Sequence, residues 1–116
     1  LAHLEAAVDD PRVSLSPLAG TLNGEPSPVS ATGGHGWDTI TRSIREVHPD
    51  VVVAPGLMIG GTDSRWYLPL ADDIYRFHPY WARPGDTDRI HGVDERIAVD
   101  NLADYVRFYR RVLENL

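Results

Sequence analysis

Hydrophobic positions follow a helical period in three stretches of the chain. In residues 1–8, 37–47 and 102–116, apolar side chains recur every three or four positions, which places them on one face of an α-helix. Pro11 and Pro49 end the first two stretches, because the residue before a proline disfavours helical geometry. The pattern therefore predicts three helices, of which the first is the tail of a helix.

The last of these helices has the clearest pattern. Asp100 is its expected N-cap, because a carboxylate at that position accepts a hydrogen bond from a free backbone N–H of the first turn. The apolar stripe consists of Leu102, Tyr105, Val106, Tyr109, Val112, Leu113 and Leu116. A stripe of this width predicts a helix that packs on the rest of the protein.

Three other stretches have the patterns of β-strands. Residues 12–18 alternate apolar and polar side chains, and Pro17 favours an edge position because proline cannot donate to a ladder. Residues 50–58 form a nearly continuous apolar run, which is typical of a parallel strand buried on both faces. Residues 73–77 are the third expected strand. Helix, buried strand, glycine-rich turn and strand in this order predict an α/β fold.

The composition changes between residues 20 and 36, where small and polar residues dominate and regular structure is interrupted. The interrupting residues include Pro26, Pro28, Gly33 and Gly34. We expect three parts: a first unit at 1–18, a crossing linker at 19–36 and a second unit at 37–116. The chain also starts at Leu1, within a helical pattern and without Met, which is typical of a segment excised from a longer protein.

Length and charge narrow the possible functions. With 116 residues, 42% of them hydrophobic, the chain suffices for one modest core. The net charge is -6 and all 11 basic residues are scattered arginines, so we expect neither nucleic-acid nor membrane-surface binding. No apolar run approaches the roughly 20 residues that span a bilayer. Because cysteine is absent, a metal would have to be bound by His, Asp or Glu.

The turn at residues 60–65, of sequence Gly-Gly-Thr-Asp-Ser-Arg, is the first candidate for chemistry. It follows the apolar run, and ligands in α/β proteins bind at the carboxyl ends of strands. Backbone N–H groups beside the guanidinium of Arg65 suit a carboxylate, which an arginine fork binds through two hydrogen bonds. The same spacing also fits a plain turn with a solvated arginine, and local pattern leaves both interpretations open.

The histidines and paired acids are weaker candidates. Five histidines are present, yet none forms a His-x-x-x-His pair, so a local zinc motif is absent. His91 differs from the others because it lies in a dense polar segment, residues 89–96, before the last helix. The paired carboxylates fall at turns, where acids commonly cap helices and solvate loops. The chain also lacks a phosphate-binding loop and a serine nucleophile elbow.

Three segments together resemble the C-terminal half of the M20 metallopeptidase family, and within it the Gly-X carboxypeptidases and N-acyl-amino-acid hydrolases. They are the turn at 60–65, the Tyr-Arg-Phe-x-Pro sequence at 75–79 and the Ile-His-Gly-x-x-Glu-Arg-Ile sequence at 90–97. The resemblance runs from about residue 27 to the end, and the segments occur in the family's order with similar spacing.

The resemblance implies a fold and a site. It implies the C-terminal portion of a three-layer α/β zinc-exopeptidase catalytic domain, preceded at residues 1–18 by the last helix and strand of an inserted lid domain that mediates dimerisation. His91 would be a metal ligand in a two-zinc site that other divalent metals can also occupy. Arg65 would hold the free carboxylate of a peptide or N-acyl-amino-acid substrate, and Gly61 and Thr62 would shape the same pocket.

The chain departs from the family's pattern at two positions. Asp94 stands where the family usually has Asn, two residues before Arg96, and His78 replaces a small polar residue before Pro79. The remaining metal ligands and the glutamate base of the family would lie in an N-terminal part that is missing here. A catalytic zinc needs about three protein ligands and a water, so one histidine does not suffice.

Three hypotheses follow. In the first, the chain is part of a zinc-dependent amidohydrolase or carboxypeptidase that cleaves the amide bond of N-acyl or C-terminal amino acids, and the isolated segment is inactive. In the second, the segment is a non-catalytic fragment or association module without a metal site. In the third, it is a small-molecule-binding module that uses Arg65 for an anionic ligand without chemistry. Substrate identity lies outside what these residues define.

Overall fold

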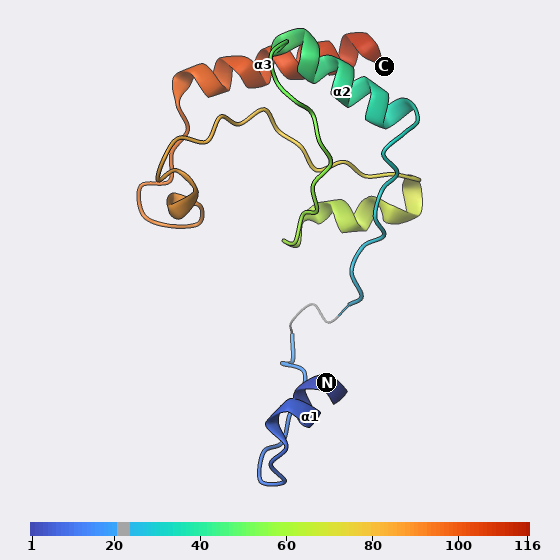
Figure 1. Cartoon of the computed structure of the whole chain (residues 1–116), viewed down its shortest axis with the longest axis vertical. Helices are drawn as coiled ribbons and strands as arrows, with labels where there is room; N and C mark the ends of the chain where they lie inside the picture. Colours follow the sequence, from blue (N-terminus) through green and yellow to red (C-terminus); the bar gives the residue numbers. More distant parts are fainter. Residues whose placement is uncertain (21–23) are drawn as a thin grey trace.

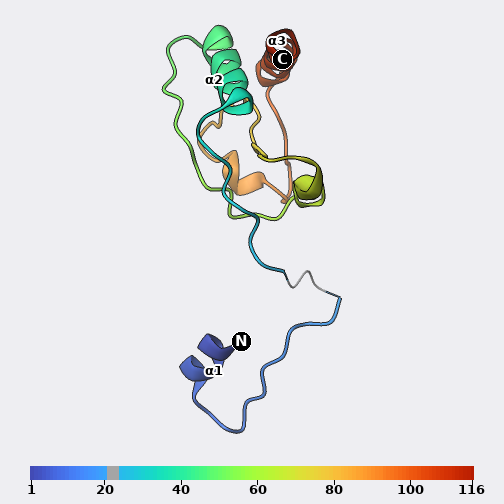
Figure 2. The same cartoon turned by 90° about the vertical axis from the view of Figure 1, so that its right-hand side faces the viewer.

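A computed structural model describes residues 1–20 and 24–116 of the chain. In these residues there are three α-helices: α1 (Ala2–Val8), α2 (His35–Val47) and α3 (Val99–Asn115). Two 3₁₀ helices, η1 (Asp63–Leu70) and η2 (Thr87–Arg89), lie between α2 and α3 in the sequence. Figures 1 and 2 show α1 apart from the other elements, whereas α2 and α3 lie side by side.

The three predicted helices are confirmed. The first ends at Val8 with Asp9 as its C-cap, which adopts a left-handed conformation with φ 43° and donates its N–H to the Glu5 carbonyl. The second ends at Val47 with His48 as its C-cap, directly before Pro49. The third begins earlier than predicted, with Ala98 as its N-cap, so the prediction of Asp100 as N-cap is wrong. Asp100 lies in the first turn, where a negative charge still suits the helix dipole.

The predicted α/β fold is wrong for the described part of the chain, where residues 1–20 and 24–116 contain no β-strand. The expected strands at 12–18, 50–58 and 73–77 are irregular segments. An apolar run becomes a strand only when a neighbouring segment pairs with its backbone N–H and C=O groups, and no described segment does so here. Neither a three-layer sheet nor a lid-domain strand is therefore present in the described residues.

The packed centre of the structure is the antiparallel pair of α2 and α3 (Figure 1). Phe108 of α3 is 2% exposed and lies edge-on to Phe77, with 5.1 Å between ring centroids. The facing side of α2 is mostly small and polar, with Thr39 and Thr41 buried beside Ile44. Small side chains at such a contact let two helix axes approach closely.

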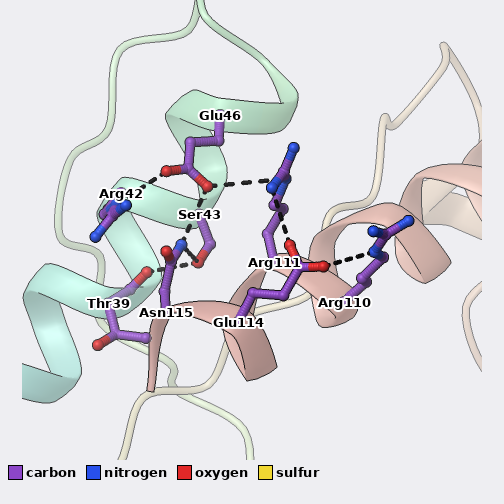
Figure 3. A network of polar contacts seen from close by, with 8 residues as sticks. All are labelled: Thr39, Arg42, Ser43, Glu46, Arg110, Arg111, Glu114 and Asn115. Carbon is purple, nitrogen blue, oxygen red and sulfur yellow. Dashed lines mark hydrogen bonds and ion pairs between the residues drawn. The ribbon is translucent and has the colours of Figure 1, made fainter.

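A polar network joins the two helices at one end of the pair (Figure 3). Asn115 donates through Nδ2 to Ser43 Oγ at 3.0 Å and to Glu46 Oε2 at 3.1 Å. Ser43 is fully buried and donates in turn to the Thr39 carbonyl at 2.7 Å. Arg42 binds Glu46 at 2.9 Å from the same helix. The buried Ser43 hydroxyl thus has partners on both helices, which a close helix pair requires of its buried polar groups.

The long segment between η1 and η2 runs beneath this pair (Figure 1). Asn101 of α3 fixes it by two hydrogen bonds to the backbone of Trp81, at 3.0 and 3.2 Å. Further along, Ser30 Oγ donates to the Ile74 carbonyl at 2.9 Å and accepts from the Ile74 N–H at 2.8 Å. Side chains therefore replace a backbone ladder in holding this segment. No helix of the described residues is long and apolar enough to cross a membrane.

Candidate functional site

The turn at residues 60–65 leads directly into the 3₁₀ helix η1. Thr62 is the N-cap of η1, with extended backbone at φ -141° and ψ 165°. Its Oγ1 accepts from the Ser64 N–H at 3.3 Å, and its carbonyl accepts from the Arg65 N–H at 3.3 Å. The hydroxyls of Thr62 and Ser64 also form a short hydrogen bond with each other. Capping of this kind explains why the chain turns here, because it satisfies N–H groups that have no helical partner.

Arg76 binds this turn from a different part of the chain. Its Nε donates to Ser64 Oγ at 2.7 Å and lies 3.2 Å from Thr62 Oγ1. Its Nη2 donates to Ser27 Oγ at 3.4 Å, so one guanidinium connects three hydroxyl groups from two segments. The sequence assigned Arg76 no role of its own. Its position within the Tyr-Arg-Phe-x-Pro motif was the available signal, and nothing local indicated its partners.

Arg65 extends from the start of η1 and is half-buried. Its guanidinium carbon lies 6.0 Å from the centroid of the Trp66 ring, within the range of a cation–π contact. The guanidinium also reaches the backbone of Gly24, where an added Cβ would lie 3.2 Å from Nη2. Within residues 1–20 and 24–116, the Arg65 side chain forms no hydrogen bond or ion pair.

Gly61 lies on the open side of the turn. It is exposed, and a Cβ added there would meet no atom within 4 Å. Packing within the described chain does not require glycine at this position, so the free space above the backbone is open to a ligand. Gly61, Thr62 and Arg65 thus lie together in one turn, as their spacing predicts.

His91 lies in a separate, exposed loop that follows η2. Its backbone is left-handed, with φ 60°, and its N–H donates to Glu95 Oε2 at 3.3 Å. Gly92 closes the loop through a bond from its N–H to the Arg89 carbonyl at 2.9 Å. No described hydrogen bond, ion pair or ring contact joins this loop to the turn at 60–65.

Asp94 also has a left-handed backbone, at φ 60°. Asn and Asp are among the non-glycine residues that adopt this conformation most readily, because their short polar side chains interact with the nearby backbone. The chain's departure from the usual Asn therefore preserves the backbone geometry of the His91 loop, while it adds a negative charge.

A zinc site requires more ligands than this loop provides. The described residues contain no group of three or more His, Cys, Asp or Glu side chains that could hold a metal ion. Zinc in a catalytic site is bound by about three protein ligands and a water. The described residues therefore do not form a metal site by themselves, and His91 supplies at most one ligand.

A cavity lies elsewhere in the described residues, between α2 and the irregular segments beneath it. It has a volume of about 890 Å³ and is lined by parts of residues 27–32, 37–48, 51–58 and 74–81. Neither Arg65 nor His91 lines it, whereas Arg76 does. His48 also lines it, with a buried Nε2 that has no hydrogen-bond partner among residues 1–20 and 24–116 and lies 3.9 Å from Asp104 Oδ2. The cavity and the predicted substrate turn thus share Arg76.

Comparison with known proteins identifies the class of protein. Residues 13–115 match the family described as Peptidase family M20/M25/M40, and the chain belongs to this family. The predicted resemblance is therefore confirmed. No solved structure was found to match the chain.

The more specific likeness is to two groups of relatives. The chain is 38% identical to N-fatty-acyl-amino acid synthase/hydrolase PM20D1.1 of Danio rerio, over 99% of this chain and 22% of the relative. It is 37% identical to Probable carboxypeptidase S-like 2 of Dictyostelium discoideum, over 97% of this chain and 21% of the relative. Putative carboxypeptidase YOL153C of Saccharomyces cerevisiae is 28% identical, over 98% of this chain and 21% of its own length. The chain thus spans about a fifth of the length of these relatives.

Proposed function

We propose that the chain acts within an M20 amidohydrolase or carboxypeptidase that cleaves the amide bond of N-acyl or C-terminal amino acids. Its contribution is recognition of the substrate's free carboxylate by Arg65. The observation that supports this role is the half-buried guanidinium of Arg65, which has no anionic or hydrogen-bonding partner in the described residues and projects from a capped turn. The family membership and the two groups of relatives, an N-fatty-acyl-amino acid synthase/hydrolase and carboxypeptidases, support the reaction class.

The physical argument for Arg65 rests on geometry and charge. A planar guanidinium offers parallel N–H donors to the two oxygens of a carboxylate, and such charge-assisted pairs are stronger than neutral hydrogen bonds. Gly61 leaves room for the substrate to approach the backbone, and Thr62 holds the turn in shape through its hydroxyl. We propose these two residues as substrate-binding together with Arg65.

We further propose that the reaction depends on divalent metal, with two zinc ions in the complete enzyme. A bound metal would polarise the scissile carbonyl and lower the pKa of a water molecule, which is the chemistry that amide hydrolysis needs. His91 is the proposed ligand from this chain, and the other ligands would come from outside the described residues. Glu95 would hold the His91 backbone in place through the bond to its N–H.

The proposed organisation of the chain has three parts. Residues 1–18 would end a lid domain through which two copies of the enzyme associate, residues 19–36 would cross to the catalytic domain, and residues 37–116 would belong to that domain. The separation of α1 from the α2–α3 pair is compatible with the division (Figure 1).

Substitution of Arg65 by Ala in the complete enzyme tests the central proposal. We expect KM for a carboxylate-bearing substrate to rise by about tenfold or more, because a charge-assisted pair is lost, while KM for the matching carboxamide stays the same. Arg45→Ala is the matched control, since Arg45 is exposed on α2 and forms no ion pair in the described residues. An unchanged KM in Arg65→Ala would exclude a carboxylate-binding role.

Substitution of His91 by Ala tests the metal proposal separately. We expect metal analysis of the complete enzyme to show loss of about one equivalent of zinc, because removal of one of about three protein ligands weakens a zinc site strongly. His3→Ala is the control, since His3 lies on α1. Full zinc occupancy after the His91 change would show that His91 is not a ligand.

A second candidate function is association without catalysis. The observation that favours it is the lack of a metal-binding group in the described residues. An amidase assay of the isolated chain with added zinc tests both proposals, because the first requires metal ligands from elsewhere and the second involves no catalysis, so each expects no activity. The same assay on the complete enzyme separates them, because only the first expects metal-dependent turnover. Zinc-dependent turnover by the chain on its own would contradict both proposals.

A further inference from the structure

We propose that Arg76 positions the substrate-binding turn, and so determines how Arg65 meets a carboxylate. The inference rests on the proposed function of Arg65 and adds a residue for which the sequence provided no role. Arg76 does not touch the substrate in this proposal, and it acts through Thr62 and Ser64.

The first support is the pattern of hydrogen bonds around the turn. Apart from Arg76, the side-chain bonds of residues 60–65 are local and join Thr62 to Ser64. Arg76 is the described side chain that reaches the turn from outside it, through bonds of 2.7 Å to Ser64 Oγ and 3.2 Å to Thr62 Oγ1. Because two glycines precede Thr62, the turn has much conformational freedom to lose, and a bond from outside restricts its orientation.

The second support is that Arg76 is itself anchored, both through the two residues before it and through its guanidinium. Its neighbour Tyr75 donates through the phenol to the Ala31 carbonyl at 2.7 Å, and Ile74 exchanges two hydrogen bonds with Ser30. The guanidinium continues the same connection through Ser27. Hydrogen bonds of residues 74–76 therefore connect the turn to residues 27–31.

The third support is the position of Arg65 relative to this anchor. The Arg65 guanidinium lies over Gly24, in the same segment that Arg76 contacts at Ser27. A shift of the turn relative to residues 24–27 would therefore move the Arg65 donors directly. Misplacement of a binding group by about 1 Å is enough to lose much of its effect on the substrate.

Lysine at position 76 distinguishes positioning from simple charge. A lysine ammonium keeps the positive charge but lacks the planar guanidinium, which directs Nε to Thr62 and Ser64 while Nη2 reaches Ser27. Lysine therefore cannot hold the turn and residue 27 in the same arrangement. If Arg76 acted only through the electrostatic attraction of its positive charge, Arg76→Lys would retain binding of the substrate carboxylate. If Arg76 acts by positioning, Arg76→Lys weakens binding of the carboxylate substrate about as much as Arg76→Ala does.

The experiment compares Arg76→Lys, Arg76→Ala and the exposed control Arg45→Ala in the complete enzyme, with a carboxylate substrate and its carboxamide. We expect both Arg76 variants to raise KM for the carboxylate by about five- to tenfold with kcat within about twofold, because binding is weakened while the chemical step is retained. KM for the carboxamide should stay unchanged. Amide hydrogen exchange at residues 62–66 should become faster in both variants, and circular dichroism should confirm that they fold.

Each outcome has a distinct meaning. A wild-type KM and wild-type exchange in Arg76→Lys would overturn the positioning role. Raised KM for carboxylate and carboxamide alike would also overturn it, because it would indicate a general disturbance of the site. If Arg65→Ala leaves KM unchanged while the Arg76 variants still accelerate exchange at 62–66, the proposed function fails and the structural role of Arg76 stands.

Discussion

The helix pair and the substrate turn are held together in different ways. In the α2–α3 pair, buried side chains of two regular elements meet directly, and Phe108 and Ser43 are almost completely enclosed. In the turn at 60–65, each residue is exposed or half-buried, and order comes from capping and from one arginine that lies 12 residues beyond Ser64. Packing thus stabilises the first region, whereas a few directional bonds shape the second.

This difference has a consequence for function. Elements with few buried apolar contacts open most easily, and binding sites are commonly built from such elements. A turn that is oriented by hydrogen bonds can also lose its shape without unfolding the helices. Mutations in the helix pair should therefore affect stability, whereas mutations in the turn should affect substrate recognition.

The largest expected effect is on the helix pair. Phe108→Ala removes a 2% exposed ring, and we expect it to lower the free energy of unfolding by about 3 kcal/mol, through lost burial and the cavity that remains. Val106→Ala is the control on the same helix, because Val106 is 67% exposed and should change stability by less than about 0.5 kcal/mol. Urea unfolding followed by circular dichroism measures both. Equal effects of the two substitutions would show that α3 is not anchored by this ring.

The sequence could predict the features that depend on local signals, but not those that depend on residues distant in the sequence. The helical stretches predicted at 1–8, 37–47 and 102–116 correspond to the helices observed at 2–8, 35–47 and 99–115, because hydrophobic period and proline positions are local signals. The strands were predicted wrongly because an apolar run such as Val51 to Val53 has strand character only where a partner strand is present, and partners are non-local. The predicted fold class was therefore wrong, although the positions of the helices were predicted correctly.

The candidate site follows the same rule. The turn with Gly61, Thr62 and Arg65 was predicted from adjacent residues, and its N-cap at Thr62 is a local feature. The bonds of Arg76 cross 12, 14 and 49 residues of sequence, and no periodic pattern indicates them. The role of His91 stays a prediction from family resemblance, because the described residues bring no second metal-binding group to it.

A smaller effect is expected in the turn. Thr62→Val keeps the shape of the side chain but removes the oxygen that accepts from the Ser64 N–H and contacts Arg76. Loss of such an N-cap costs about 1 kcal/mol, so amide exchange at residues 64–66 should become about fivefold faster. The unfolding midpoint of the helix pair should stay the same. A matching loss of stability in both regions would contradict their independence, and Thr87→Val, in η2, is the control substitution.

The smallest effect concerns the pH dependence of the helix pair. The hydrogen bond from Asn115, followed by the one from Arg42, lowers the pKa of Glu46 from its ordinary value of 4.5. A carboxyl whose pKa is lower in the folded than in the unfolded state stabilises the fold above the unfolded pKa, and this contribution is lost as the pH falls through the folded value. We therefore expect the α2–α3 contact to weaken below about pH 4.5, while the neutral hydroxyls of the turn at 60–65 do not respond.

Glu46→Gln isolates this effect, because the amide keeps the size of the side chain and cannot titrate. Unfolding midpoints measured at pH 7 and pH 3 should differ less in Glu46→Gln than in the unchanged chain, and Asn115→Ala should remove most of the same difference, since the Asn115 bond is the largest cause of the pKa shift. Glu5→Gln, on the exposed α1, controls for a general loss of negative charge. An identical pH dependence in Glu46→Gln and the unchanged chain would show that the bond between Asn115 and Glu46 adds nothing to the helix contact. The buried side chains and the bond from Asn115 to Ser43 would then hold α2 and α3 together, and the contrast with the turn at 60–65 would stand.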